Sequence, residues 1–358
     1  MPLSTRITSS LIGILSLSLL TLALACSGRA PEAGGNVQLQ GAGATFPYPL
    51  YQKWMSEYGK LHPNIQIDYQ SIGSGGGIKQ IQAQTVDFGA SDSPMKDADL
   101  KAAPGELLHV PTVLGAVVLT YNLSSISQPL RFSSDVIADI FLGKLKRWND
   151  PRIQADNPGV NLPAADVVVV HRSDGSGTSA VFTDYLSKVS SEWKSKVGTG
   201  TSPSWPIGIG GKGNEGVTGQ VKNTPNTIGY VELAYAGQNN LPVALIKNRA
   251  GEFVAPSLDA VTAAAAESIS STPDDLRVSI TDPAGKATYP ISSYTYILVY
   301  KDQKNEAKGK ALVDFLWWGI HDGEQHAKPL QYAPLPAEIV KRAEAKISSI
   351  TSGGKPLR

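Results

Sequence analysis

Three short segments rich in glycine and small hydroxyl residues are the first candidates for binding an anion. They span residues 41–49, 72–77 and 174–179, and each stands directly before a stretch with helical spacing. The first backbone N–H groups of a helix lack partners and carry a partial positive charge, so each helix start can hold an oxyanion. Three starts that converge on one cleft would enclose a tetrahedral anion. For any single segment the alternative is a plain helix cap, because Ser and Thr are usual capping residues.

One arginine stands beside the third segment. Arg172 follows the apolar run 167–170 and precedes Asp174 by two residues. A guanidinium at a strand end can clamp two oxygens of an anion, and a nearby carboxylate can orient it. The alternative is an ordinary surface ion pair, which contributes little to stability.

A further glycine-rich run, at 208–213, resembles a nucleotide-binding loop only superficially. Such a loop needs a Gly five residues before its Gly-Lys pair and a Ser or Thr after it, and these places hold Pro206 and Gly213. We therefore expect a flexible or structural loop there, and loop rather than core across 199–219.

Short β-rich runs alternate with helical patterns from about residue 38 onward, which predicts an α/β fold with largely parallel sheets. Ligands bind at the C-terminal ends of such strands, where the third segment lies. The clearest expected strands are 65–69, 113–121, 167–170 and 294–300, and the expected helices are 50–61, 78–84, 133–142, 179–189, 257–268, 307–318 and 337–347.

The N-terminus has the composition of a targeting segment. Arg6 precedes an uncharged run at 7–25, and Cys26, the only cysteine, follows Leu-Ala-Leu-Ala. This pattern predicts a signal peptide at 1–25, a lipidated Cys26 and a flexible tether at 26–37. The alternatives are a plain secretory signal and an N-terminal membrane helix. A single cysteine excludes an intramolecular disulfide.

The balance of charge excludes some classes of partner. The formal net charge is +1, from 32 basic and 31 acidic side chains. Such a chain has no electrostatic footprint for nucleic acid or for an anionic membrane surface, so any anion site must be local. The five histidines show no metal-ligand spacing, and we expect neither a metal nor a cofactor.

With these segments in hand, the chain resembles the periplasmic phosphate-binding proteins of Pst-type ABC importers, members of the two-lobed substrate-binding protein superfamily. The resemblance runs from about residue 41 to the C-terminus. The motifs that carry it are Gly-Ala-Gly-Ala-Thr-Phe-Pro at 41–47, Ile-Gly-Ser-Gly-Gly-Gly at 72–77, Val-Asp-Phe-Gly-Ala-Ser-Asp at 86–92, Phe-Leu-Gly-Lys at 141–144, Asp-Gly-Ser-Gly-Thr-Ser at 174–179, Trp-Pro-Ile-Gly at 205–208 and Ile-Gly-Tyr-Val-Glu at 228–232.

The resemblance implies a two-lobed periplasmic-binding-protein fold, in which each lobe is a mainly parallel sheet flanked by helices. Lobe 1 would comprise 38–117 and 295–358 and lobe 2 would comprise 118–294, joined by two crossing hinge strands. The implied function is high-affinity extracytoplasmic binding of inorganic phosphate by a monomer, which closes around it and delivers it to the permease subunits of an ABC importer. The chain would be periplasmic or at the cell surface, attached to the membrane through lipidated Cys26.

The resemblance also implies the residues that bind phosphate, with Asp174 holding Arg172 in place behind them. Ser74 is followed by Gly75, where some relatives have Ser. The implied phosphate-binding residues are Thr45, Phe46, Ser74, Asp92, Arg172, Ser176, Gly177 and Thr178.

Asp92 is the residue expected to decide selectivity. A carboxylate aimed at an anion is unfavourable unless the ligand brings a proton to share, which phosphate does and sulfate does not. Arsenate keeps that proton, so we expect weak discrimination against it. The alternative is that Asp92 is a helix cap before Ser93-Pro94.

Two other classes of protein stay open at this stage. A phosphatase-like hydrolase could use Ser176, although the sequence around it lacks the Gly-x-Ser-x-Gly elbow and only His171 stands near as a base, so we expect no enzyme. A secreted phosphate-binding sensor or adhesion protein without a transporter would have the same sequence features.

Overall fold

The computed structural model describes residues 35–358. Residues 36–358 form one compact unit. The expected signal peptide, Cys26 and most of the expected tether lie outside the described residues.

An eight-stranded sheet runs through this unit in the order β2-β1-β3-β11-β4-β8-β6-β7. The strands β2, β1 and β3 pair in parallel at one end, and β8, β6 and β7 pair in parallel at the other. Between them β11 and β4 run antiparallel to their neighbours. The strands are β1 (Val37–Gly43), β2 (Ile65–Ser71), β3 (Phe88–Ser91), β4 (Leu107–Tyr121), β6 (Val168–Arg172), β7 (Ile209–Gly211), β8 (Thr227–Glu232) and β11 (Ser292–Tyr300).

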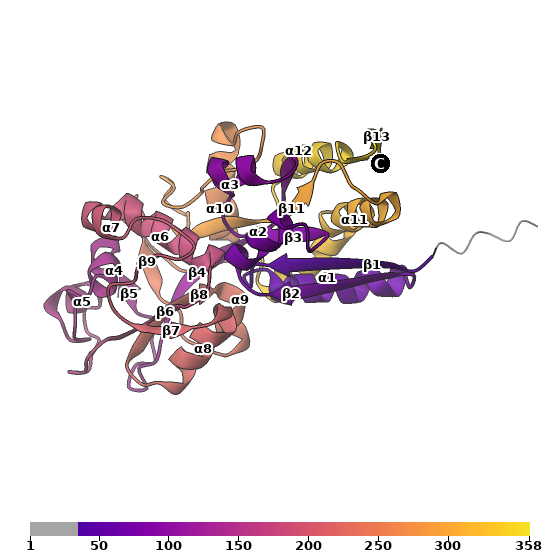
Figure 1. The fold of residues 1–358 in the computed structure, drawn as a ribbon. Coiled ribbons are helices and arrows are strands. Elements are labelled where there is room, and N and C mark those ends of the chain that lie inside the picture. Colours follow the sequence, from indigo (N-terminus) through magenta and orange to yellow (C-terminus); the bar gives the residue numbers. More distant parts are fainter. Residues whose placement is uncertain (1–34) are drawn as a thin grey trace, which may run out of the picture. The chain divides into compact units, whose positions relative to one another are not determined.

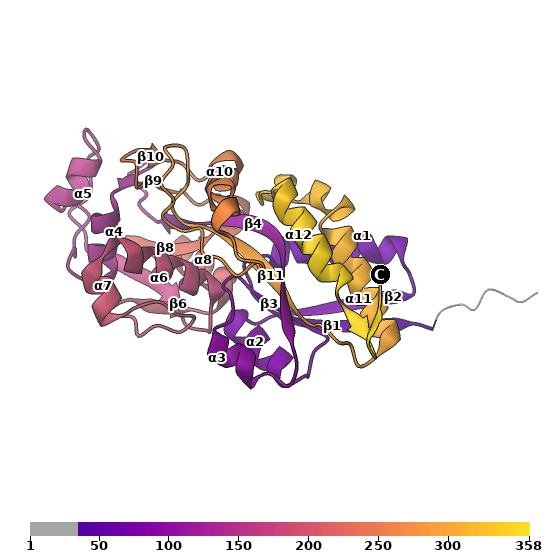
Figure 2. The same cartoon turned by 90° about the horizontal axis from the view of Figure 1, so that it is seen from above.

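The two central strands join the parallel sets. The first part of β4 pairs with β11 and its last five residues, from Val117, pair with β8. All fifteen residues of β4 are buried, and most are apolar or β-branched, which suits a strand covered on both faces. Figures 1 and 2 show β4 and β11 between the group of elements around β1 and the group around β6. We call these groups the β1 half and the β6 half.

Helices flank both halves of the sheet, and every helix and strand expected from the sequence is present, with ends that differ by a few residues. The α-helices are α1 (Tyr48–Leu61), α2 (Ser74–Gln82), α3 (Asp97–Ala102), α4 (Ser134–Phe141), α5 (Pro151–Asp156), α6 (Gly177–Val189), α7 (Ser191–Lys196), α8 (Gly213–Asn223), α9 (Leu233–Gln238), α10 (Leu258–Ser268), α11 (Glu306–Gly319) and α12 (Ala337–Ser348). Smaller strands form a sheet of β5 (Arg131–Phe132), β9 (Leu245–Lys247) and β10 (Phe253–Val254) and a hairpin of β12 (Thr351–Ser352) and β13 (Lys355–Pro356).

The segment 199–219 differs from its prediction as a loop. It contains β7, which pairs with β6, and the first residues of α8. Its glycines lower helix propensity, but Val217 and Val221 of α8 are fully buried, and their packing outweighs the propensity. The run 208–213 is therefore a strand followed by a helix start, not a flexible loop.

Candidate functional site

The three glycine-rich segments meet where helices start. The first leads into α1, whereas α2 begins inside the second segment after Gly73 and α6 begins inside the third after Ser176. Gly73 has φ of 84°, a left-handed conformation that favours glycine, and turns the chain from β2 into α2. Two of these starts belong to the β1 half and the third to the β6 half, so the site lies between the halves.

Main-chain contacts hold the second and third helix starts together. The Gly75 N–H donates to the carbonyl oxygen of Gly175 at 2.9 Å. A Cβ on Gly177 would overlap Ser74 Oγ and would lie 2.5 Å from a carboxylate oxygen of Asp92. The start of α6 therefore lies directly against Ser74 and Asp92.

Several buried backbone N–H groups at this point have no acceptor among residues 35–358. They are the N–H groups of Phe46, Ser74, Gly177 and Thr178. Buried N–H groups are almost always paired, so a cluster of them marks a place for an acceptor that the chain does not supply. All four belong to residues that the sequence predicted for the site.

Arg172 is fixed beneath the start of α6. Its Nε and Nη2 donate to the two carboxylate oxygens of Asp174 at 2.8 and 2.6 Å, and Nη1 donates to Thr178 Oγ1 at 3.3 Å. Although burial opposes ionisation, the hydrogen bonds and charge of Arg172 hold the pKa of Asp174 below its ordinary value. The Arg172 side chain is 1% exposed, so this is a buried, oriented pair and not the surface ion pair considered as the alternative.

Asp92 places a buried carboxylate at the site. It is 1% exposed, and its two carboxylate oxygens accept from Thr295 Oγ1 at 3.0 Å and from Ser74 Oγ at 3.5 Å. Burial raises the pKa of Asp92 from 3.8 to about 7, against the lowering effects of Thr295, Arg172 and Ser74. The alternative of a helix cap is wrong, because the next helix begins only at Asp97 and its cap position is Lys96.

Two hydroxyls of the predicted set have defined local roles. Ser176 Oγ accepts from the N–H of Ser179 at 3.0 Å, so Ser176 caps α6, as the alternative for a single segment proposed. Thr45 is 2% exposed, and its Oγ1 accepts from Asn214 of the β6 half. The structure thus brings all eight predicted binding residues and Asp174 together; Cys26 is outside the described residues.

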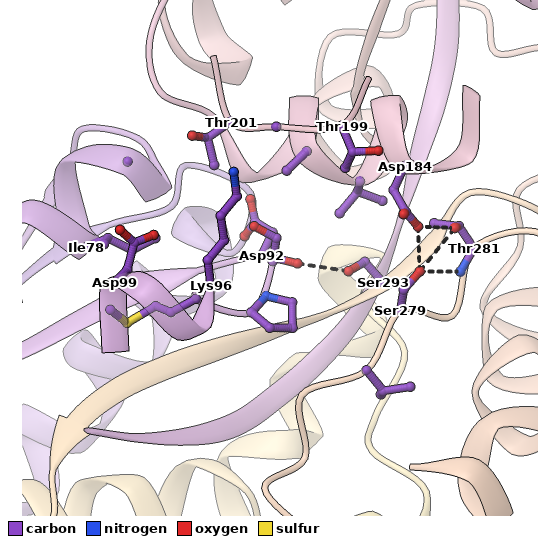
Figure 3. Close-up of a pocket in the computed structure, with 18 of the residues that line it drawn as sticks. Ile78, Asp92, Lys96, Asp99, Asp184, Thr199, Thr201, Ser279, Thr281 and Ser293 are labelled. Atoms are coloured by element: carbon purple, nitrogen blue, oxygen red, sulfur yellow. Dashed lines mark hydrogen bonds between the residues drawn. The ribbon is translucent and has the colours of Figure 1, made fainter. Parts of the chain in front are cut away.

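A pocket of about 430 Å³ lies beside the site and reaches Asp92. Figure 3 shows the pocket between α2, α3 and α6, where the Ser293 hydroxyl donates to the carbonyl oxygen of Asp92 at 3.0 Å. Asp184, at the other end, accepts from Ser279 and Thr281. Asp92 therefore contacts the start of α6 and also lines this pocket.

The chain is similar in sequence to a known family of binding proteins. The model of the family described as "PBP superfamily domain" matches residues 29–318. The phosphate-binding protein PstS of Xylella fastidiosa strain 9a5c is 47% identical over 315 residues, which cover 88% of this chain and 86% of that protein. This chain belongs to the phosphate-binding protein family within that superfamily. PstS of Pasteurella multocida, another member, is 48% identical over 89% of this chain and 93% of its own.

Solved structures of lower identity show the same fold. A phosphate-binding protein from Stenotrophomonas maltophilia has a TM-score of 0.67 at 20% identity and covers 86% of this chain and 93% of its own. The chain therefore has the periplasmic-binding-protein fold, with its mainly parallel sheet and flanking helices.

Sequence reasoning missed a layer of residues behind the family's predicted ligands. Tyr235 and Tyr332 donate to the carbonyl oxygens of Thr45 and Phe46 at 2.5 and 2.6 Å, which fixes the backbone of the first segment. Asn214 contacts Thr45 and Thr178. Asn214 carried a usable signal, since it follows a fourth glycine-rich run before a helix, but the tyrosines carried none.

No group of three or more His, Cys, Asp or Glu side chains could hold a metal ion within residues 35–358. No helix in the same range is long and apolar enough to cross a bilayer.

Proposed function

We infer that this chain binds inorganic phosphate with high affinity outside the cytoplasm and delivers it to an ABC-type phosphate importer. One observation carries the inference: buried residues whose N–H groups have no acceptor among residues 35–358 lie together with the buried carboxylate of Asp92, whose pKa is raised. A fully deprotonated anion would leave that carboxylate facing like charge, whereas phosphate brings both acceptor oxygens and a proton. Family membership supports the same ligand and confirms that the chain is a substrate-binding protein and not an enzyme.

Each predicted residue has a proposed part in binding. Phe46, Ser74, Gly177 and Thr178 donate from their backbone N–H groups, and Arg172 adds its guanidinium. The remaining donors are the hydroxyls of Thr45, Ser176 and Thr178, while the Ser74 hydroxyl donates to Asp92. Asp174 keeps Arg172 in place and Asp92 accepts the phosphate proton.

This arrangement favours phosphate over sulfate. A site that bonds a ligand's hydrogen rejects analogues that lack it by roughly 10⁴- to 10⁵-fold, since its buried acceptor is otherwise unpaired. Arsenate carries the same hydrogen and would be discriminated weakly.

Calorimetric titration of the mature chain with phosphate and then sulfate tests the proposal. We expect tight phosphate binding and little sulfate binding. Arg172→Ala leaves Asp174 without its ion-pair partner and removes a charged donor, so we expect at least about a 100-fold loss of phosphate affinity. The control is Arg249→Ala, at an exposed position, which should bind phosphate normally. Equal affinity of the wild-type chain for both anions would contradict the proposal.

Delivery would depend on closure of the two lobes. Lobe 1 (38–117 and 295–358) would move against lobe 2 (118–294) about β4 and β11. Closure around phosphate would bury the ligand's charge and strengthen each hydrogen bond. Loss of phosphate uptake when the chain is deleted would separate a transport role from a sensor or adhesion role, in which uptake would be unchanged.

We further propose that the chain acts as a monomer held at the membrane by lipid on Cys26. Support comes from the sequence pattern before Cys26 alone. Wild-type protein should partition into detergent and Cys26→Ala should not; light scattering of the Cys26→Ala protein should give the mass of one chain. Equal partitioning of both would contradict the anchor.

A further inference from the structure

The amide of Asn214 joins the two halves of the molecule. Asn214 is the second residue of α8 and is fully buried. Its backbone N–H and its Nδ2 donate to Thr45 Oγ1 at 3.2 and 2.7 Å, and Nδ2 also lies 3.2 Å from Thr178 Oγ1. Thr45 belongs to the β1 half and Thr178 to the β6 half, so one amide contacts a predicted ligand from each.

The orientation of this amide is fixed. Asn214 Oδ1 accepts from the backbone N–H of Glu232 at 2.9 Å. A backbone N–H can only donate, so the atom facing Glu232 must be the oxygen. Asn214 therefore presents only donors to the two threonines.

Donors from Asn214 determine what the threonine hydroxyls can do. A hydroxyl has one proton to donate and two lone pairs that accept. Both lone pairs of Thr45 Oγ1 are taken by Asn214, and those of Thr178 Oγ1 are taken by Asn214 and by Arg172 Nη1 at 3.3 Å. Neither hydroxyl proton has an acceptor among residues 35–358. Each buried proton is left to point at whatever occupies the site.

We propose that Asn214 is a positioning and specificity-determining residue, which makes the Thr45 and Thr178 hydroxyls obligate donors to the bound anion. The inference rests on the proposed phosphate function. With both hydroxyls restricted to donation, neither threonine can accept the phosphate hydrogen, and the carboxylate of Asp92 is left to accept it. The protonated oxygen of phosphate must then face Asp92, and unprotonated oxygens must face the threonines.

The first test compares Asn214→Ala with Asn223→Ala by calorimetric titration with phosphate. Asn223 lies at the exposed end of the same helix, where its amide donates only to the Gly219 carbonyl. Without the Asn214 amide the two hydroxyls rotate freely, so we expect phosphate affinity to fall by about 10- to 100-fold. Asn223→Ala should bind as the wild type does. Wild-type affinity in Asn214→Ala would overturn the proposal.

A double-mutant cycle separates action through the hydroxyls from a general effect on packing. In the Thr45→Val/Thr178→Val background, no hydroxyl is left for Asn214 to orient. Adding Asn214→Ala there should change phosphate affinity by less than about threefold. The same loss in both backgrounds would show that Asn214 acts in another way and would overturn the proposal.

The result stays decisive even if Asn214→Ala does not fold. The single variants Thr45→Val and Thr178→Val should each lower phosphate affinity by about tenfold or more, because each loses a donor to the anion. Unchanged affinity in both would overturn the proposal. A wild-type chain that fails to bind phosphate would instead refute the proposed function itself.

Discussion

At the scale of single residues, the proposed role of Asp92 is to determine which anion the site accepts. Its carboxylate is held between Thr295 and Ser74. Asp92→Asn keeps the shape and replaces one acceptor with a donor. We expect sulfate to bind this variant within about tenfold of phosphate, compared with roughly 10⁴-fold discrimination in the wild type. Paired titrations with both anions measure this, and wild-type selectivity in the variant would show that Asp92 does not recognise the proton.

The same residue should shape the stability of the phosphate-free chain. The pKa of Asp92 rises from 3.8 to about 7 on folding. Between those values the folded chain holds a proton that the unfolded chain has released, so this group's contribution to stability is present at low pH and is lost as pH rises towards 7.

Asp92→Asn cannot lose that contribution. The free energy of unfolding of the variant, minus that of the wild type, should therefore increase between about pH 4 and pH 7 and exceed about 1 kcal/mol above that range. Urea unfolding without phosphate at several pH values measures the difference. A difference that does not vary with pH would mean that Asp92 is not protonated on folding.

At the scale of elements, the helix starts need glycine where they touch. A Cβ at Gly177 would overlap Ser74 Oγ and crowd Asp92. Gly177→Ala should lower phosphate affinity by at least about 100-fold by keeping α6 away from α2, while the chain still folds. Gly219→Ala is the matched control, since nothing lies within 4 Å of its Cβ position in α8. It should raise the free energy of unfolding by about 0.5–1 kcal/mol and leave binding unchanged.

The helix starts at the site were predictable from sequence, but the residues from distant parts of the chain that contact them were not. Residues such as Gly73 and Ser176 mark local turns and caps, whose chemistry depends on near neighbours. The bond from Thr295 to Asp92 joins residues 203 positions apart, and no local pattern contains it. The start of α8 was missed because its glycines favour a loop, while buried Val217 and Val221, which stabilise the helix, act only in the folded chain.

At the scale of the whole molecule, the order of elements followed from alternating patterns, and the family resemblance supplied the two halves. The periodicity of the sequence predicted the long buried strand β4 as 113–121, although the strand begins at Leu107. Its extra length pairs with β11, which comes from the far end of the chain. A pairing over that distance depends on the complete fold, so the continuity of the eight-stranded sheet could not be predicted from local sequence.

The rate at which phosphate associates with the molecule should depend little on ionic strength. Arg172 is already neutralised by Asp174, and the net charge of the chain is only +1. Without a positive field there is little steering to screen. Stopped-flow association rates should change by less than about threefold between low and high ionic strength. A steep decrease of the association rate with salt would show electrostatic steering that these charges do not account for.

The main-chain bond between Gly75 and Gly175 needs no ligand, and neither do the bonds from Asn214 and Tyr235 to Thr45. Groups of the chain itself therefore favour the closed arrangement of the two halves. A transporter that responded to the closed arrangement alone would hydrolyse ATP without transporting phosphate whenever the chain closed without its ligand. Buried N–H groups that lack an acceptor within the chain oppose closure unless an anion accepts from them, so the closed arrangement should be more populated with phosphate than without it.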